Sequence, residues 1–483
     1  MYLSTHTCHA FAYHIYTLIL VLLTATACSE SWEHYSTDPG MRLSFSSDTL
    51  KLDTVLTNIP TSTRLLKVYN RQDEALLISS IDLAGNSGFR INVDGQKGYH
   101  FSNVEIAARD SLHIFVEATL ASTGQPTPTL VKDSILFMLN GNRQEVKLTA
   151  YAQDAYSLRA HRIETDTVIQ TTRPLLIYDS LSVAPNARLT LGPGTQLYFH
   201  SKAVMHIHGQ LTVNGTLQQP VVFRGDRTDK LFSYLPYDRL PGQWGGIVIH
   251  PTSFNNSLDH AEIRGAETGL RCDSSSLQAP KLNLTNSRIT QASTDALSLN
   301  HCLAQVTNSE LSNAGRHCLS LQGGRYTFVH CTVANFFSWN SRQGTSLYAA
   351  HTDEATAPCK ATFVNCLITG SNTTEAYLPE MNQQQAACQF QNTLLKAPAD
   401  LILTPTDYPP TLIQQDAFTA IDTQAQYYNF VPTDGSPAID AANAQAAQPY
   451  PLDRNEHSRL TDAAPDAGCY EAPKKKTLNP PRI

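Results

Sequence analysis

Residues 284–289 read Leu284-Thr285-Asn286-Ser287-Arg288-Ile289, which is an apolar residue, any residue, Asn or His, a small residue, any residue, and then Ile, Val or Leu. The phrase occurs six times in the 483 residues. Its copies are centred on His260, Asn286, Asn308, His330, Asn365 and Asn392. The centres lie 26, 22, 22, 35 and 27 residues apart. A period of roughly 20 to 50 residues is typical of repeat proteins, so the chain is predicted to form a solenoid.

Each copy of the phrase predicts which side chains point into the solenoid. Its two apolar ends and its small residue are expected to face inward, with the equivalent residue of the next lap above each of them. The Asn or His is expected at a bend, because these residues tolerate left-handed backbone angles and can pass a hydrogen bond to the next lap. Cys331 and Cys366 occupy the small position and are predicted to be small interior residues, although an oxidising compartment would permit a disulfide where geometry allowed one.

A second inward column is expected downstream of each Asn or His. Its members are Leu270, Leu297 and Leu319, with Leu347 displaced by an insertion near residues 335–344. The outward positions beside this column are Arg271, Ser298, Ser320 and Tyr348. Inward leucines at aligned offsets in successive laps favour stacked parallel coils about 4.8 Å apart.

The residues before the repeats divide into two regions. Residues 41–155 hold short alternating segments split by turn signals such as Asn140-Gly141-Asn142, which predicts an antiparallel β-sandwich of immunoglobulin-like type. From about residue 160, brief strands are joined by Gly-centred bends. The predicted fold class is therefore all-β, with a sandwich over 41–155 followed by the solenoid over 160–473.

Residues 160–473 resemble the right-handed parallel β-helix of the pectin-lyase-like superfamily. The resemblance is carried by Gly192-Pro193-Gly194-Thr195, by Trp244-Gly245-Gly246-Ile247 and by the six phrases. Ser436-Pro437-Ala438-Ile439-Asp440 and Pro465-Asp466-Ala467-Gly468 resemble the closing segment of β-helix proteins called choice-of-anchor Q. We expect residues 430–473 to cap the last coil, with charged side chains pairing across its open edge. The expected capping residues are Asp440, Asp453, Arg459 and Asp466.

The N-terminus predicts export. Residues 15–27 form an apolar run of 13 residues, too short to span a bilayer, and end in Ala25-Thr26-Ala27-Cys28. This resembles a bacterial lipoprotein signal, which implies a signal peptide over 1–27 and a lipid on Cys28; an ordinary secretory signal is the alternative, because no Lys or Arg precedes Ile15. The polar, acidic residues after Cys28 resemble the export tag of surface lipoproteins of Bacteroidetes. Residues 28–40 are expected to be a tether and residues 474–483 a disordered tail.

Composition excludes several functions. A formal net charge of −7 and the lack of long basic runs argue against nucleic acid as a partner. The ten cysteines show no CxxC pair or metal-ligand spacing. His206 and His208 share a strand face, but a metal site would need a third ligand such as His200 or His250, and solvated histidines are favoured. No cofactor or metal is expected.

Catalytic residues are not evident from the sequence. Enzymes of the pectin-lyase-like superfamily cluster carboxylates, Lys, Arg or calcium ligands on one outward sheet face, and the outward positions identified above contain no carboxylate pair. The sequence patterns of polygalacturonases and pectate lyases are also absent or incomplete. Asp295, Arg316 and His317 flank neighbouring coils and are the weak catalytic candidates, with a solvated rim favoured over them.

The favoured function is therefore a lipid-anchored protein of the outer membrane or cell surface. Its β-helix would offer a non-catalytic surface for a glycan or a cell-surface protein, in adhesion or envelope architecture. The alternative is a polysaccharide lyase or glycoside hydrolase with an unfamiliar site, and a third possibility is a structural spacer. An enzyme should show a groove with two carboxylates or a carboxylate beside Lys or Arg, whereas a binding module should show aromatic and hydroxyl side chains.

Overall fold

The computed structural model describes residues 34–350, 359–378, 387–398, 410–461 and 464–473. Its contacts divide the chain into two compact units. The first contains the described residues up to Leu52, with 60–119 and 131–150; the second contains 53–59, 120–130 and the described residues from Tyr151 onward. The predicted signal peptide, the lipid site at Cys28 and the tail at 474–483 lie outside the described residues. No described helix is long and apolar enough to cross a bilayer.

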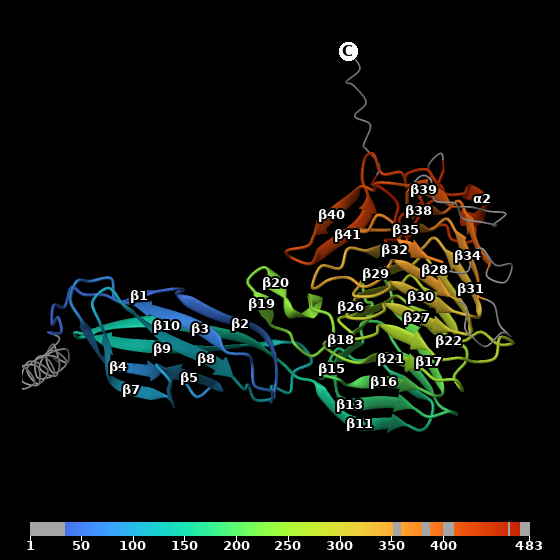
Figure 1. Cartoon of the computed structure of the whole chain (residues 1–483). Coiled ribbons are helices and arrows are strands. Elements are labelled where there is room, and N and C mark those ends of the chain that lie inside the picture. Colours follow the sequence, from blue (N-terminus) through green and yellow to red (C-terminus); the bar gives the residue numbers. More distant parts are fainter. Residues whose placement is uncertain (1–33, 351–358, 379–386, 399–409, 462–463, 474–483) are drawn as a thin grey trace, which may run out of the picture. The chain divides into compact units, whose positions relative to one another are not determined.

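The first unit is built from two five-stranded sheets (Figure 1, blue and teal). One has the strand order β1 (Ser44–Phe45), β3 (Arg64–Tyr69), β8 (Ser111–Ala118), β5 (Phe89–Val93), β6 (Gln96–Gly98), and the other β2 (Thr49–Leu56), β10 (Asn142–Gln153), β9 (Thr129–Leu139), β4 (Leu76–Leu83), β7 (His100–Ile106). Buried and open residues alternate along β8 and β9, as expected when each sheet has one face in a core. The immunoglobulin-like type of this sandwich stays a prediction.

The second unit is a solenoid of parallel strands, as predicted (Figure 1, green to orange). Each lap contributes a strand to three columns, which we call faces C, B and A in the order in which the chain visits them. Face C consists of β12 (Thr167–Ile169), β14 (Arg188–Leu191), β17 (Gln210–Asn214), β22 (Asn256–Asp259), β25 (Leu282–Thr285), β28 (Leu303–Thr307), β31 (Arg325–Val329), β34 (Lys360–Val364) and β37 (Ala387–Gln391).

Faces B and A are joined at the start of the solenoid. The strand β13 (Leu175–Val183), which follows β11 (Tyr156–Ile163), pairs with face B through its first residues and with face A through its last. Face B consists of β15 (Gln196–Phe199), β18 (Val221–Gly225), β23 (Ala261–Arg264), β26 (Arg288–Ala292), β29 (Glu310–Ala314), β32 (Thr332–Asn335), β35 (Leu367–Gly370), β38 (Leu394–Lys396) and β39 (Thr411–Ile413). Face A consists of β16 (Val204–Ile207), β21 (Gly246–Ile249), β24 (Leu270–Cys272), β27 (Leu297–Asn300), β30 (Leu319–Gln322), β33 (Leu347–Ala350) and β36 (Ala376–Tyr377).

The corner between faces C and B carries the six Asn and His residues of the repeated phrase. All six have a left-handed backbone: φ is 51° at His260, 49° at Asn286, 50° at Asn308, 49° at His330, 54° at Asn365 and 48° at Asn392. Asn308 donates to Asn286 at 2.7 Å, and the side chains of Asn365 and His330 are hydrogen-bonded at 3.0 Å. Asn286 donates to Asp259 at 2.8 Å rather than to His260.

The small residues that follow form a second ladder. In every lap after that of Ala261 the side chain donates to the carbonyl two residues earlier: Ser309 to Thr307 at 2.7 Å, for example. It also accepts the backbone N–H of the equivalent residue one lap before, as Ser309 does from Ser287 at 3.1 Å. Cys331 and Cys366 occupy the same ladder, and all eight described cysteines are buried. The position therefore holds a small side chain, with a polar atom in every copy except Ala261, which takes part through its backbone N–H alone.

The core fills the space between the three faces. Leu270, Leu297, Leu319 and Leu347 are aligned in successive strands of face A and are fully buried. The insertion after β32 does not shift Leu347 out of this column. On face C the rings of Phe328, Phe363 and Phe390 stack at 4.8 and 5.2 Å.

The described part of the C-terminal segment, residues 416–461 and 464–473, lies along the outer side of face B, whereas the sequence predicted a cap across the last coil. It contains β40 (Phe418–Asp422), β41 (Tyr427–Pro432) and α2 (Ala444–Ala447). Ala438 and Ala467 pack on Leu367 and Leu394, and contacts continue back to Glu262, which forms an ion pair with Arg454. The physical reason is that face B carries outward residues such as Leu367 and Glu262 that need a cover.

The four residues expected in the cap contact mainly one another and their own segment. Asp466 accepts the backbone N–H of Asp440 at 2.9 Å, and Asp453 accepts that of Glu471 at 2.8 Å. Arg459 donates to Glu471 at 2.6 Å and to Asn308 at 2.7 Å, so its carboxylate partner is not one of the three predicted aspartates. The hydrogen bond from Arg459 to Asn308 links the segment to the bend column.

Candidate functional site

Face A presents a straight outward column of side chains. The strand register places Arg271, Ser298, Ser320, Tyr348 and Tyr377 above one another. The two serines are only 8% and 2% exposed, whereas Tyr377 is 52% exposed. The column is therefore open mainly at its arginine and tyrosine ends.

The tyrosines belong to a stack of three rings. The imidazole of His317 lies 4.7 Å from the ring of Tyr348, with planes 29° apart. The ring of Tyr348 lies 5.5 Å from that of Tyr377, with planes 11° apart. Among the described residues, neither phenol has a hydrogen-bond partner. A stack along the solenoid axis directs ring edges and phenol groups outward.

The three weak catalytic candidates are brought together beside this stack. Arg316 donates to both oxygens of Asp295, through Nε at 2.8 Å and through Nη2 at 2.5 Å. The backbone N–H of His317 donates to Asp295 at 3.1 Å. Asp295 is 1% exposed, so its carboxylate is enclosed by donors of its own chain.

This arrangement favours positioning over proton transfer. The hydrogen bond to Asp295 raises the pKa of Arg316. Burial lowers the pKa of His317, although Asp295 acts in the opposite direction. His317 Nδ1 faces the backbone of Thr345, with its N–H at 3.2 Å. The cluster holds the imidazole beneath Tyr348 and leaves Asp295 without an open oxygen for a general base.

A histidine cluster lies near the other end of face A. His206 Nδ1 is 3.0 Å from His250 Nε2, and the rings of His208 and His250 stack at 4.0 Å. His250 also approaches Asp273 at 3.5 Å. Burial lowers the pKa of both His206 and His250, and the neighbouring imidazoles act in the same direction. His200 pairs with Asp226 instead. Within the described ranges, no group of three or more His, Cys, Asp or Glu has a metal-binding arrangement.

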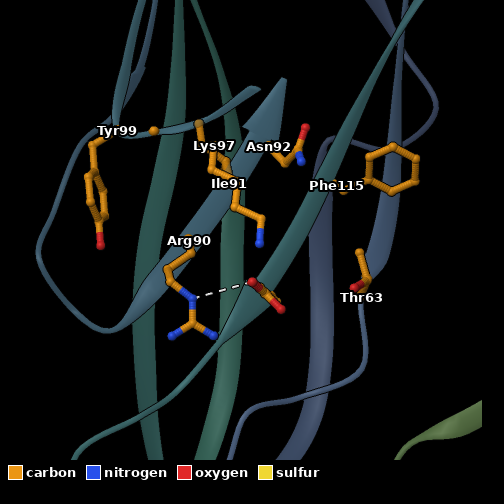
Figure 2. Close-up of a pocket in the computed structure, with 9 residues that line it drawn as sticks. Thr63, Arg90, Ile91, Asn92, Lys97, Tyr99 and Phe115 are labelled. Carbon is orange, nitrogen blue, oxygen red and sulfur yellow. Dashed lines mark hydrogen bonds and ion pairs between the residues drawn. The ribbon is translucent and has the colours of Figure 1, made fainter. Parts of the chain in front are cut away.

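The first unit has a concavity of about 750 Å³ on its own surface. Figure 2 shows Arg90, Asn92 and Lys97 around it, with Tyr99 and Phe115 on opposite sides. Arg90 pairs with Glu117 at 3.4 Å, and their side chains are 39% and 33% exposed. Such a solvated pair on an open sheet surface gives little binding energy by itself.

Comparisons with known proteins leave the chain without a family. No protein-family profile and no curated protein matches it. A family 123 glycoside hydrolase from Clostridium perfringens, studied for glycolipid glycan hydrolysis, has a TM-score of 0.18 at 7% identity, over 23% of this chain and 27% of that one. A protein of unknown function from Porphyromonas gingivalis W83 has a TM-score of 0.16 at 10% identity, over 26% and 60%.

A third solved structure covers more of the chain. The catalytic unit of a thermostable GH87 α-1,3-glucanase from Streptomyces thermodiastaticus strain HF3-3 has a TM-score of 0.19 at 13% identity, over 68% of this chain and 67% of that one. Of the family 123 glycoside hydrolase described above, the chain spans only about a quarter of the length. TM-scores this low give no basis for transferring an activity.

Proposed function

We propose that this chain is a lipid-anchored envelope protein that binds a glycan on face A without cleaving it. The observation that carries the proposal is the ring stack of His317, Tyr348 and Tyr377 on one outward column. The lipid anchor rests on the sequence around Cys28, and surface exposure rests on the acidic residues that follow it.

The stack has the regularity that a polymeric ligand can use. Successive strands of a parallel sheet lie about 4.8 Å apart, so the two phenol groups repeat along the solenoid axis. Tyrosine combines a large apolar ring with a hydroxyl group, which suits the C–H faces and hydroxyls of a sugar. Arg271, at the other end of the column, adds a cation that Asp273 holds at 3.0 Å.

Binding is favoured over catalysis because of the state of Asp295. Both its oxygens accept hydrogen bonds from Arg316, and the residue is buried. A general base or acid must instead reach the substrate with a free oxygen. The open ends of the outward column contribute a guanidinium and two phenols, which are groups that bind sugars.

The test is a glycan array probed with the full chain purified in detergent. Replacing Tyr348 and Tyr377 together by Ala is expected to abolish the signal for the glycans that bind, because both rings of the stack are lost. Tyr151→Ala is the matched control, since Tyr151 is 48% exposed and lies in the strand β10. An unchanged glycan profile for the double variant would place binding elsewhere.

A reducing-end assay on the same glycans separates binding from cleavage. We expect no new ends from the wild-type chain. Release of new ends from an acidic polysaccharide, abolished by Asp295→Asn or by His317→Gln, would establish the lyase or hydrolase function in place of the one proposed.

A further inference from the structure

A groove of about 300 Å³ lies on the outer side of face B. Three separate parts of the second unit build it. Its floor comes from β23, β26 and β29, one wall from the short helix η1 (Tyr237–Arg239), and the other from the turn between β40 and β41. It is separate from the ring stack, which lies on face A.

Two buried polar atoms of groove residues have no hydrogen-bond partner in the described structure. They are Nε of Arg264 and Oε1 of Gln291. Gln291 is 4% exposed, and its backbone is left-handed, with φ of 57°, near the end of β26. A buried polar group without a partner costs about 1–3 kcal/mol, so a ligand that supplied an acceptor and a donor in this groove would recover part of that cost.

The other charges of the groove are already engaged. Asp238 lies between Arg224 at 3.1 Å and Arg264 Nη2 at 3.2 Å. Glu310 accepts from Tyr470 at 2.5 Å and from Ser312 at 2.6 Å. The carboxylates of the groove are therefore satisfied by groups of the chain.

The cations leave an excess of positive charge. The groove is lined by Arg239, Arg264 and Arg288 against Asp238 and Glu310. Arg239 donates to the backbone of Ala425 at 2.8 Å and lies 5.4 Å from the ring of Tyr427. An incoming ligand thus meets the side chain of Arg264, which is 27% exposed, the edge of Gln291, and the ring of Tyr427, which is 46% exposed.

We infer that this groove binds a small hydroxylated carboxylate. On binding, the side chains of Arg264 and Gln291 turn their unpartnered atoms toward the ligand. The carboxylate then accepts from Nε of Arg264, a hydroxyl donates to Oε1 of Gln291, and the C–H face of the ligand packs on Tyr427. The volume lies at the lower limit of ligand pockets, which run from about 300 to 1,000 Å³, so it suits one sugar acid or hydroxy acid rather than a polymer.

Calorimetric titration of the full chain with four probes tests the chemistry. Gluconate and methyl glucuronoside carry both groups, glucose lacks the carboxylate, and acetate lacks the hydroxyls. We expect at least tenfold tighter binding of one of the first two than of glucose or acetate. Preference for gluconate identifies a free hydroxy acid and preference for the glucuronoside the end of a glycan. Equal or absent binding of all four probes overturns the inference.

Two conservative variants locate the site. Gln291→Asn retracts the amide oxygen but keeps a residue suited to φ above zero, because Asn313 occupies the equivalent position one lap later with φ of 54°. Arg264→Lys keeps the charge and removes Nε. Each is expected to weaken the preferred probe at least tenfold, while Arg325→Lys on the exposed surface of face C leaves it unchanged.

A third variant guards against misfolding. Tyr427→Ala removes an exposed ring and is expected to weaken the probe severalfold without changing the circular dichroism spectrum. If Gln291→Asn and Tyr427→Ala both fold and both bind as wild type does, the groove is not the site. The glycan array on face A is independent of this result, because none of these residues belongs to the ring stack.

Discussion

The Asn or His at the corner between faces C and B holds a left-handed backbone in all six laps, which a residue with a branched side chain would strain. In the four middle laps its side chain also reaches a neighbouring lap or the C-terminal segment. Asn308 does both: it donates to Asn286 and accepts from the buried Arg459. One residue type thus satisfies a turn and a ladder at once.

Replacing Asn308 by Ala is expected to lower the free energy of unfolding by about 3 kcal/mol. About 1–2 kcal/mol comes from an L-residue at φ of 50°, and about 1.5 kcal/mol from the hydrogen bond to the charged Arg459. Asn308→Gly also removes the hydrogen bond, but Gly adopts a positive φ without strain. Its loss of unfolding free energy should therefore be about 1 kcal/mol smaller than that of Asn308→Ala. Denaturant titration measures both, and a Gly variant less stable than the Ala variant would contradict the backbone argument.

The small-residue ladder predicts a difference between Ala and Cys. Ser309→Ala leaves the N–H of Ser287 buried without its acceptor and should cost about 1–2 kcal/mol. Ser309→Cys keeps a polar atom, as Cys331 and Cys366 do one and two laps on, and should cost less than half as much. The check is thermal unfolding of the two variants side by side; equal losses would mean that size alone decides this position.

His330 predicts sensitivity to acid. Burial, followed by the charge of Arg459, lowers its pKa to about 3, whereas a free histidine titrates near 6.5. The unfolded chain therefore takes up a proton that the folded chain refuses, and stability falls by about 1.4 kcal/mol per pH unit as the pH drops below 6.5. Above pH 6.5 His330 is neutral in both states, so this loss of stability is absent there.

His330→Asn tests this sign, because Asn occupies the same corner in the laps on either side and suits the φ of 49°. We expect near-wild-type stability at pH 7.5 and a smaller loss between pH 6.5 and 4. Glu471 acts in the opposite direction, since burial raises its pKa to about 7, so the difference between variant and wild type is the quantity to measure. Identical pH profiles would show that His330 titrates normally.

At residue scale the sequence was informative wherever a local rule decided the structure. Asn and His announce a left-handed bend, and all six were identified by their spacing. The corner between faces B and A is a second such column, with Gly265, Gln291 and Asn313 at φ of 71°, 57° and 54°. The sequence does not predict this column, because Gln is not typical of a left-handed bend. For the same reason it does not predict the unpartnered Oε1 of Gln291 in the groove.

At element scale the C-terminal segment is the main departure from expectation. Its outward-facing partners on face B are separated from it by long stretches of chain: Arg454 reaches Glu262 across 192 residues. The resemblance of this segment to a closing segment led to the expectation that its charged residues pair across an open end. Only the register of β23, β26 and β29 shows that Glu262 and Glu310 face outward beneath the segment.

A double-mutant cycle tests whether the segment is fastened there. Arg454→Met and Glu262→Gln should each destabilise, the first by about 3 kcal/mol because Glu262 stays buried with Arg288 as its remaining cation. Made together, they should cost at least 1 kcal/mol less than the sum of the single losses. Additive losses would mean that the two side chains do not interact in solution.

At the scale of the whole molecule, the all-β class and the parallel solenoid were predictable because one period runs through more than a hundred residues. The groove on face B was not, because residues 236–239 and 426–428 meet there only after folding. The ring stack was predictable in part. The repeat register predicts that Tyr348 faces outward, whereas its contacts with His317 and Tyr377 form only in the folded chain.

The lipid anchor gives a prediction for the intact chain in its cell. Cys28→Ala is expected to abolish labelling with radioactive palmitate and to move the protein from the membrane fraction to the soluble one, because one cysteine supplies the attachment site. Cys469→Ala is the matched control, since Cys469 is buried and burial raises its pKa to about 12. Retained labelling in Cys28→Ala would favour an ordinary secretory signal.

The position of residues 416–473 on face B also sets an order of events during synthesis. A ribosome delivers the laps that carry Glu262, Glu310 and Leu367 before it delivers their cover. A polypeptide that terminates early would therefore display a strip of sheet with exposed apolar and charged groups, ready to adhere to another nascent copy. Completion of translation is thus the step that makes this surface inert.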